Sequence, residues 1–405
     1  MKHDGGSVRT LRRWGTAALL VVALAATPAL AACGTSEHSS NATQSQAERK
    51  VTPAAVQTPV KITTEPADGA SDVSPTGPIT VTAAEGTLDE VRLSNPEGAP
   101  VAGRLAADRH SWTTTEPLGY DRTYTWSGTA RGTDGKPVPI SGSFHTLRPA
   151  RQIQGSLNVG DNETYGVAMP IVVSFSSPVA DKAAAERALS VQTSVPVEGG
   201  WAWLDSQHVH WRPKAYYPPG TRVTVTAKLY GVPLGNGAYG REDVTSTFTI
   251  GHAQVVRANT QTHRVVVYRD GQEIANYPAS FGLDSDPGRV THSGIHVVMS
   301  KSPTYSMSNP RYHYENVVVP WAVRISNNGE FIHGLAESMW AQGKRNVSHG
   351  CANLSPANAK AYYDIAVIGD PVEVTGSSVP LGPADGDFYD WTIDWNTWSS
   401  MSALR

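Results

Sequence analysis

The chain has 405 residues, a length that as a soft prior allows roughly two to four domains. Its formal net charge is −3 and only 17% of its residues are charged, so it lacks the strongly basic field that binds nucleic acid. The 37 glycines and 28 prolines, together with frequent threonines, favour β structure with many turns.

The chain starts with a leader of the exported type. Basic residues precede an apolar run at 17–26, and small residues then lead to Cys33. Pro28 interrupts this run, whereas a membrane-spanning helix needs about 20 apolar residues. Because Leu30-Ala31-Ala32-Cys33 resembles a bacterial lipobox, we expect a lipoprotein signal peptide over 1–32 and lipidation of Cys33. The alternative is an ordinary signal peptide with Cys33 merely near the cleavage site.

Two blocks of short, alternating strands follow a polar, flexible tether at 33–58. Residues 59–148 and 149–250 each hold several strand-like segments separated by turn signals, and the two blocks end in similar sequences. This pattern predicts a mainly β chain with two immunoglobulin-like β-sandwich domains in series, the second interrupted by a short helix at 182–189.

Aromatic residues gather in two places. Five in the second sandwich either line a sugar-binding face or pack in the core and hinge: Trp201, Trp203, Trp211, Tyr216 and Tyr217. Three in the C-terminal extension at 376–405 are spaced for one face of a helix, and we expect them to pack against the domain before it: Trp391, Trp395 and Trp398.

A third, β-rich domain is expected at 251–375, with longer strands at 263–269 and 317–325. Ser355 is a favoured N-cap and Pro356 suits the first helical position, which predicts a short helix running to residue 367. Since Cys351 lies just before this helix, we expect the partial positive charge of the helix N-terminus to help stabilise a thiolate.

The lone thiol of Cys351 is the centre of the predicted chemistry. If Cys33 is lipidated, Cys351 has no intramolecular disulfide partner, so a retained thiol indicates reactivity. Gly350 allows a sharp turn with N–H groups near the sulfur. His333 and His349 are both candidates for the base, and we assign His333, with His349 orienting the loop.

His333-Gly334 followed by Ser348-His349-Gly350-Cys351-Ala352-Asn353-Leu354 closely resembles the YkuD-type L,D-transpeptidase signature. The paired sandwiches and the Trp-rich extension also resemble the mycobacterial-type lipoprotein members. The resemblance implies acyl transfer on peptidoglycan stem peptides without a cofactor. The thiolate displaces D-Ala from a tetrapeptide stem, and a side-chain amine of a second stem resolves the thioester as a 3→3 cross-link. It also implies acylation by carbapenems.

The resemblance further implies a role for each residue that matches the motif. Cys351 is the nucleophile, His333 the base and acid, and the carbonyl of Gly334, a serine in similar members, orients the His333 ring. His349, Gly350 and Cys351 surround the oxyanion site. Residues expected to contact substrate are Ser348, Asn353, Asn328, Gly329, Tyr305 and Tyr314, with Tyr312 as the alternative to Tyr314.

The sequence leaves three other interpretations open. A zinc site could form from His292 and His296 with His333, His349 and Cys351, although we expect no metal. A lipid-anchored wall-binding protein would need no catalysis. A different acceptor would change the enzyme: water would make an L,D-carboxypeptidase, and a protein amine would make an anchoring enzyme. The expected partners are stem peptides as donor and acceptor and, through the anchor, the outer face of the cytoplasmic membrane. No nucleic acid is expected, and the sequence does not indicate an oligomeric state.

Overall fold

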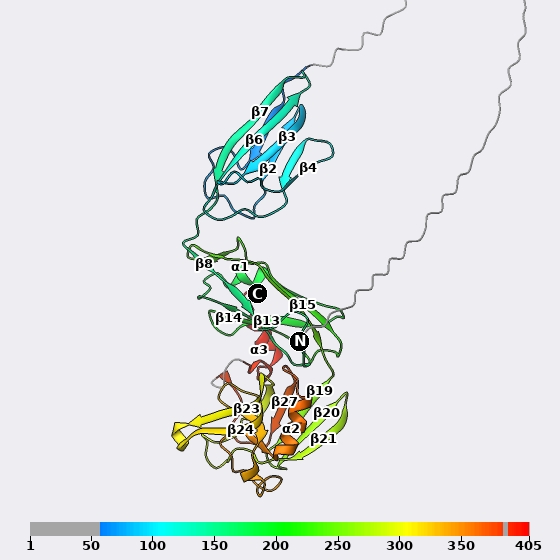
Figure 1. Ribbon diagram of the computed structural model, residues 1–405, viewed down its shortest axis with the longest axis vertical. Coiled ribbons are helices and arrows are strands. Elements are labelled where there is room, and N and C mark those ends of the chain that lie inside the picture. Colours follow the sequence, from blue (N-terminus) through cyan, green and yellow to red (C-terminus); the bar gives the residue numbers. More distant parts are fainter. Residues whose placement is uncertain (1–56, 384–387, 405) are drawn as a thin grey trace, which may run out of the picture. The chain divides into compact units, whose positions relative to one another are not determined.

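The computed structural model describes residues 57–383 and 388–404 (Figure 1). The leader, the lipidation site Cys33 and nearly all of the tether lie outside these residues. The described chain consists mainly of strands, as the sequence predicted, with few and short helices. Among the described residues, no helix combines the length and apolar character needed to span a membrane.

The first sandwich has two antiparallel sheets, with strand orders β1-β2-β5-β4 and β3-β6-β7. Alternation along the strands turns one set of side chains inward, where Trp112 meets Trp126 edge-on at 5.6 Å between ring centroids. The strands are β1 (Lys61–Glu65), β2 (Thr80–Ala84), β3 (Gly86–Ser94), β4 (Gly103–Leu105), β5 (Ser111–Thr114), β6 (Thr123–Gly132) and β7 (Pro137–His145).

The second sandwich has sheets ordered β10-β18-β15-β12 and β13-β14-β11-β9, with a small third sheet, β16-β17-β8. Helix α1 (Lys182–Arg187) confirms the predicted helix but ends earlier, because Leu189 already begins β12. The strands are β8 (Arg151–Ile153), β9 (Gly155–Leu157), β10 (Thr164–Tyr165), β11 (Ile171–Phe175), β12 (Leu189–Thr193), β13 (Gly199–Trp203), β14 (His208–Pro213), β15 (Arg222–Ala227), β16 (Pro233–Gly235), β17 (Ala238–Gly240) and β18 (Val244–Ile250).

The five aromatic residues of the second sandwich serve packing. Trp203, Trp211 and Tyr217 are buried in its two apolar clusters, and Trp201 packs against both clusters. Tyr216 is partly buried and its hydroxyl donates to Glu373 of the following domain at 3.1 Å. The core-and-hinge interpretation therefore describes these residues better than a sugar-binding face.

The third domain has two sheets, ordered β21-β20-β19-β27-β22 and β23-β24-β25-β26. We call them the anchor sheet and the site sheet. The strands are β19 (Gln254–Asn259), β20 (Arg264–Arg269), β21 (Gln272–Pro278), β22 (Gly294–Val297), β23 (Ser300–Asn309), β24 (Tyr314–Arg324), β25 (Phe331–Gly334), β26 (Ala352–Leu354) and β27 (Pro371–Thr375). The long β23–β24 hairpin, yellow in Figure 1, contains the short helix η1 (Pro310–Tyr312), and η2 (Ala336–Ser338) follows β25.

Helix α2 (Pro356–Ile365) begins as the sequence predicted, since the Ser355 hydroxyl accepts the Asn358 N–H at 3.2 Å and Pro356 is its first residue. It ends two residues before the predicted limit, because Ala366 is extended and the Lys301 ammonium takes its carbonyl at 2.6 Å. The helix packs on β24 and β25 and so covers the site sheet.

The three tryptophans of the extension do not share one helix. Trp391 lies in η4 (Asp390–Thr392), while Trp395 and Trp398 lie in α3 (Trp395–Ser400). Asp394 separates the two segments, because its carboxylate caps α3 by accepting the Asn396 and Thr397 N–H groups. The three indoles instead surround the Arg212 guanidinium of the second sandwich at 4.8, 5.2 and 4.6 Å. The expectation of one helical face was therefore wrong. The extension does meet the third domain, because η4 packs on β22, and its tryptophans contact the second sandwich as well.

Candidate active site

Parallel pairing of β25 with β26 brings the candidate catalytic residues together. His333 lies opposite Asn353 in this register, so their side chains emerge on the same face of the sheet. Cys351 precedes Asn353 by two positions and therefore points to that face as well. A short strand pair thus unites His333 and Cys351, which are far apart in the sequence.

His333, Cys351 and Asn353 line one cavity of about 450 Å³ beside the β23–β24 hairpin. Its walls are mostly apolar, and Glu337 is the only acidic side chain among the described residues that line it. The lining residues are Met307, Tyr314, Val317, Val319, His333, Leu335, Glu337, Ser338, Trp340, Val347, Ser348, His349, Cys351 and Asn353.

The His333 ring is held in one tautomer. Its Nδ1 donates to the carbonyl of Gly334 at 3.0 Å, which leaves Nε2 as the unprotonated nitrogen in the neutral ring. Burial lowers the pKa of His333 to about 4, and the Gly334 carbonyl opposes this only in part. The ring is therefore neutral near pH 7 and can accept a proton.

The Cys351 thiol is 9% exposed and contacts the carbonyl of Gly329 at 3.7 Å. Burial raises its pKa to about 12, while the backbone of Phe331 lowers the pKa and the Glu330 carboxylate raises it. The raised pKa runs against the expected thiolate, because burial of the sulfur outweighs the other effects on it. With this pKa the thiol carries its proton near pH 7.

The turn before Cys351 is braced from both sides. The Ser348 hydroxyl donates to the Cys351 carbonyl at 2.5 Å and accepts the Gly350 N–H at 3.2 Å, so it is used within the turn although Ser348 lines the cavity. Gly350 has a φ of +119°, which a residue with a side chain rarely adopts. Arg289 donates to the carbonyls of Ser348 and Val347 at 3.1 and 2.5 Å.

His349 is exposed and its ring contacts two tyrosines of the hairpin, Tyr312 at 4.9 Å and Tyr314 at 5.4 Å. Partial burial lowers the pKa of His349, and the nearby Arg289 lowers it further. Tyr314 lines the cavity and Tyr312 does not. Tyr305 stacks on Phe331 at 4.7 Å and packs behind the thiol.

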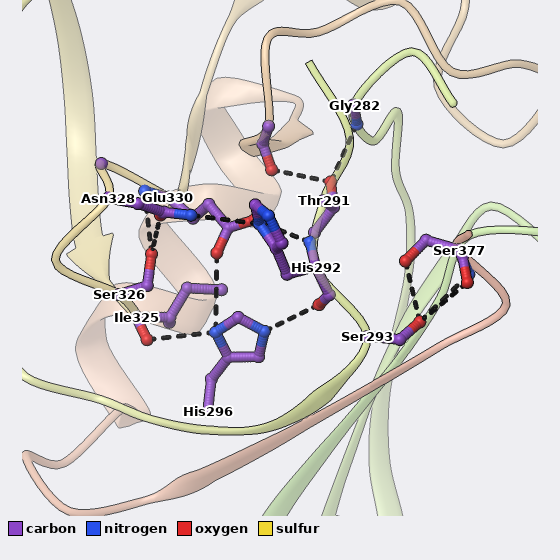
Figure 2. A network of polar contacts seen from close by, with 12 residues as sticks. Gly282, Thr291, His292, Ser293, His296, Ile325, Ser326, Asn328, Glu330 and Ser377 are labelled. Carbon is purple, nitrogen blue, oxygen red and sulfur yellow. Dashed lines mark hydrogen bonds and ion pairs between the residues drawn. The ribbon is translucent and has the colours of Figure 1, made fainter. Parts of the chain in front are cut away.

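Two further sequence candidates lie beside the sulfur or in the cavity wall. Gly329 supplies the carbonyl that contacts the thiol, and the Oδ1 atom of buried Asn353 has no hydrogen-bond partner among the described residues. Asn328 does not line the cavity. It instead contacts Ser326 and, at 3.0 Å, the Nδ1 atom of His292 (Figure 2).

The histidines of the alternative zinc set lie in different surroundings. His292 and His296 both face the Glu330 carboxylate (Figure 2). His333 and Cys351 instead line the cavity. Among residues 57–383 and 388–404, no group of three or more His, Cys, Asp or Glu side chains is arranged to hold a metal ion.

Sequence reasoning missed three residues at this site: Arg289, Glu330 and Glu337. Arg289 and Glu330 act on segments remote in sequence, so no local spacing marks them. Glu337 is different, because it follows His333 by four residues in the segment that leads to the cysteine motif. An acidic residue in that segment was a usable signal.

Two family models match the chain, one described as a bacterial Ig domain over residues 70–233 and one as an L,D-transpeptidase catalytic domain over residues 253–374. L,D-transpeptidase 2 of Mycobacterium tuberculosis is 37% identical over 407 residues, covering 99% of this chain and 98% of that protein. The chain belongs to the L,D-transpeptidase family.

Other family members are also similar to this chain. L,D-transpeptidase 5 of Mycobacterium tuberculosis is 52% identical over 348 residues, which cover 85% of this chain and 77% of that protein. A solved L,D-transpeptidase in complex with imipenem is 34% identical and covers 56% of this chain and 100% of its own, with a TM-score of 0.48. Family membership confirms the predicted fold class and the predicted enzyme class, an acyltransferase.

Proposed function

We propose that this chain is a peptidoglycan L,D-transpeptidase that uses Cys351 as its nucleophile and His333 as its base and acid. The single observation that carries the proposal is their shared cavity, in which the Gly334 carbonyl holds the His333 ring with Nε2 available. The substrate class rests on family membership, since relatives that cover nearly the whole chain are named L,D-transpeptidases.

The proposed reaction starts from neutral partners. With a thiol pKa of about 12 and an imidazole pKa of about 4, a thiolate–imidazolium pair is disfavoured before substrate binds. We infer that the thiol proton moves to Nε2 as sulfur attacks the carbonyl carbon of the donor L,D-amide. The oxyanion forms against the backbone of the turn at His349–Cys351. His333 then protonates the departing amine of D-Ala, and the C–N bond breaks to leave a thioester.

The acceptor we propose is an amine of a second stem rather than water. The bound ammonium first loses one proton to solvent. The neutral nitrogen then attacks the thioester carbon and gives a second proton to His333, which returns it to the Cys351 sulfur as the C–S bond breaks and the new amide forms. Glu337 supports this choice, because the only carboxylate among the described residues of a mostly apolar cavity attracts the ammonium form of the incoming amine. The Asn353 Oδ1 atom, which has no hydrogen-bond partner among the described residues, is suited to accept an N–H from bound peptide.

The chain outside the site completes the proposal. We propose that residues 1–32 are a signal peptide, that Cys33 carries a lipid anchor, and that 33–58 is a tether. The sandwiches at 59–148 and 149–250 would then hold the catalytic domain at 251–375, with its extension at 376–405, at the outer face of the membrane. Mutation of Cys33 followed by cell fractionation tests the anchor. Release of the mature protein from the membrane fraction would support lipidation, and retention of the mutant in that fraction would contradict it.

The decisive experiment incubates the full chain with a disaccharide-tetrapeptide that carries a third-position diamino acid. We expect mass spectrometry to show loss of D-Ala together with a cross-linked dimer, and Cys351→Ala to abolish both. A carbapenem should add its mass to the wild type and not to Cys351→Ala. Activity in Cys351→Ala would refute the mechanism, whereas D-Ala loss without a dimer would favour the carboxypeptidase.

The acceptor is tested through Glu337. Glu337→Gln should lower the ratio of dimer to hydrolysed product several-fold, because the ammonium loses its attraction while water does not. Glu315→Gln is the matched control, since Glu315 is an exposed residue of β24 that does not line the cavity. Equal product ratios in the two variants would remove Glu337 from the acceptor site.

A further inference from the structure

Glu330 directly precedes β25, between two residues that contact the nucleophile. The residue before it, Gly329, accepts a contact from the Cys351 thiol at 3.7 Å. The residue after it, Phe331, interacts with the same sulfur through its backbone and lowers the pKa of the thiol. Both neighbours of Glu330 therefore contact Cys351, which links the backbone at Glu330 to the sulfur on either side.

The Glu330 side chain lies in a polar network with His292 and His296 (Figure 2). It is only 4% exposed. Its Oε1 atom accepts the backbone N–H of His292 at 2.7 Å and lies 2.9 Å from the Nδ1 atom of that ring. Its Oε2 atom forms an ion-pair contact with the Nδ1 atom of His296 at 3.7 Å.

His296 lies beside the Glu330 carboxylate. Its ring is fully buried, and both of its nitrogens face carbonyl oxygens: Nε2 lies 2.8 Å from the His292 carbonyl and Nδ1 lies 3.2 Å from that of Ile325. Because a carbonyl oxygen only accepts, the ring donates to at least one of them and is fixed in place. The Glu330 Oε2 atom has no hydrogen-bond partner among the described residues, so the 3.7 Å contact with this fixed ring is what confines it.

The segment that carries His292 also forms a hydrogen bond with the turn before Cys351. Thr291, next to His292, donates its hydroxyl to the Gly350 carbonyl at 2.7 Å and accepts the Gly282 N–H at 2.9 Å. A side chain at Gly350 would lie 3.6 Å from the Glu330 Cγ atom. The segment 291–292 is thus bonded both to the turn that carries Cys351 and to the strand that contacts its sulfur.

We propose that Glu330, held by His292 and His296, is a positioning residue that fixes the Cys351 nucleophile between its strand and its turn. This inference rests on the proposed function only in taking Cys351 as the nucleophile. Glu330 does not touch substrate or the reacting atoms, since it does not line the cavity. It acts through Gly329, Phe331 and the His292 segment.

A purely structural ion pair and a positioning residue differ in what they do to the thiol. The titratable groups around Cys351 are Glu330 and, in the cavity wall, His333, Glu337, Tyr314 and His349. Of these, the Glu330 charge raises the pKa of the thiol. Glu330→Gln removes this charge but keeps the shape and an oxygen for the His292 N–H. The thiol should become more acidic while its placement loosens.

The experiment measures two quantities on the full chain, the rate of Cys351 alkylation by iodoacetamide as a function of pH and the kcat for stem-peptide transfer. For Glu330→Gln we expect the alkylation midpoint to move to lower pH and kcat to fall about 10-fold to 10²-fold with KM unchanged. A faster-reacting thiol in a slower enzyme is a combination that simple loss of stability does not produce.

The matched control is Asp390→Asn. Asp390 forms a comparable buried pair with His210 at 2.8 Å, between the extension and the second sandwich. The substitution Asp390→Asn should lower the melting temperature without changing the alkylation midpoint or kcat. If Glu330→Gln leaves both readouts as Asp390→Asn does, the proposal is overturned.

A second variant serves if Glu330→Gln does not yield folded protein. His292→Ala removes the ring contact but keeps the backbone N–H to Glu330, and we expect a smaller fall in kcat with unchanged KM. No fall in kcat would overturn the proposal in that case as well. Failure of the proposed function looks different, because Cys351→Ala would then retain transfer activity whatever the alkylation profile shows.

Discussion

The two sheets of the catalytic domain have five and four strands and share one core, but they serve different purposes. The anchor sheet is tied to the second sandwich: Ile368 and Gly369, which lead into β27, accept N–H groups of Gly166 and Ala168 at 2.8 and 2.9 Å, and Glu373 of β27 accepts the Tyr216 hydroxyl. The site sheet carries His333 and Asn353, the strand beside Cys351, and the apolar hairpin over the cavity.

Unfavourable groups occur on both sheets, since Arg269 Nε on β20 is buried without a hydrogen-bond partner among the described residues and Ile274 on β21 is 45% exposed. The site sheet has a neutral buried histidine, an Asn353 oxygen without a hydrogen-bond partner among the described residues, and Val318, which is 66% exposed. The anchor sheet has its own buried acid, Asp370, before β27, but Gln254 and the Val367 N–H both donate to it. Chemistry and attachment are therefore separated between sheets, and the separation can be tested.

The largest expected effect is a difference in kcat between a variant of the site sheet and a variant beside the anchor sheet. His333→Gln should lower kcat about 10²-fold to 10⁴-fold, because no group remains to accept the thiol proton. Asp370→Asn, a buried polar change beside the anchor sheet, should leave kcat within about twofold. Steady-state transfer assays on the full chain measure both, and a comparable loss in Asp370→Asn would contradict the separation.

The second expected effect is a difference in how the stability contributions of His333 and Asp370 depend on pH. The folded state holds the pKa of His333 at about 4, below its ordinary value of 6.5, so its contribution to stability is present above pH 6.5 and is lost as the pH falls towards 4. Burial raises the pKa of Asp370 to about 7 from 3.8, so its contribution is present below pH 3.8 and is lost as the pH rises towards 7. The two contributions, about 3 and about 4 kcal/mol, oppose each other between pH 4 and 6.5.

Denaturant unfolding at several pH values checks this opposition. The wild type should change little over the shared window, since the two slopes offset. Relative to it, His333→Gln should lose stability with rising pH and Asp370→Asn should gain stability. Parallel curves for the two variants would show that these groups do not titrate in opposite directions.

The third effect is confined to the hairpin of the site sheet. Val317 lines the cavity and is 41% exposed, whereas its neighbour Val318 points to the other face of β24. Val317→Asp should raise KM for the stem peptide about tenfold, the value of one lost valine contact. Val318→Asp is the control on the same strand and should leave KM unchanged. A rise in both would indicate a general disturbance of the hairpin.

The smallest effect concerns the attachment of the anchor sheet. Tyr216→Phe removes the hydroxyl that donates to Glu373 and should cost about 1 kcal/mol of stability without changing kcat. Tyr277→Phe is the control, because the Tyr277 hydroxyl on β21 makes no hydrogen bond with the described residues. Equal melting temperatures for the two variants would mean that the Tyr216 bond contributes nothing.

The sequence predicted best what neighbouring residues decide. The start of α2 follows from Ser355 and Pro356, because a cap is satisfied within one turn. The cysteine motif likewise predicted the family that the comparisons show. In the extension a local signal was present but overlooked, since Asp394 caps α3 and so interrupts the spacing of the tryptophans.

What the sequence did not predict depends on pairing between remote segments. The parallel register of β25 and β26 decides that His333 and Asn353 share a face, and no spacing in the chain encodes it. Glu330 acquires its role only when β25 meets the segment at 291–296. The thiolate expected from the helix N-terminus failed for a related reason, because burial depth, which dominates the Cys351 pKa, is a property of the assembled core.

Gly334 has a practical consequence for exchanging parts between relatives. A Cβ atom at this position would lie 3.0 Å from the Pro320 Cγ atom on β24 and 3.1 Å from the Pro356 Cα atom of α2. One missing methyl group thus sets how closely the hairpin strand approaches the helix across the His333 strand. In a homologue with serine at this position, the hairpin strand and the helix must lie farther apart to make room for the side chain. A hairpin grafted from such a homologue would therefore not fit closely against α2 of this chain. Chimaeras should therefore transfer positions 320, 334 and 356 together.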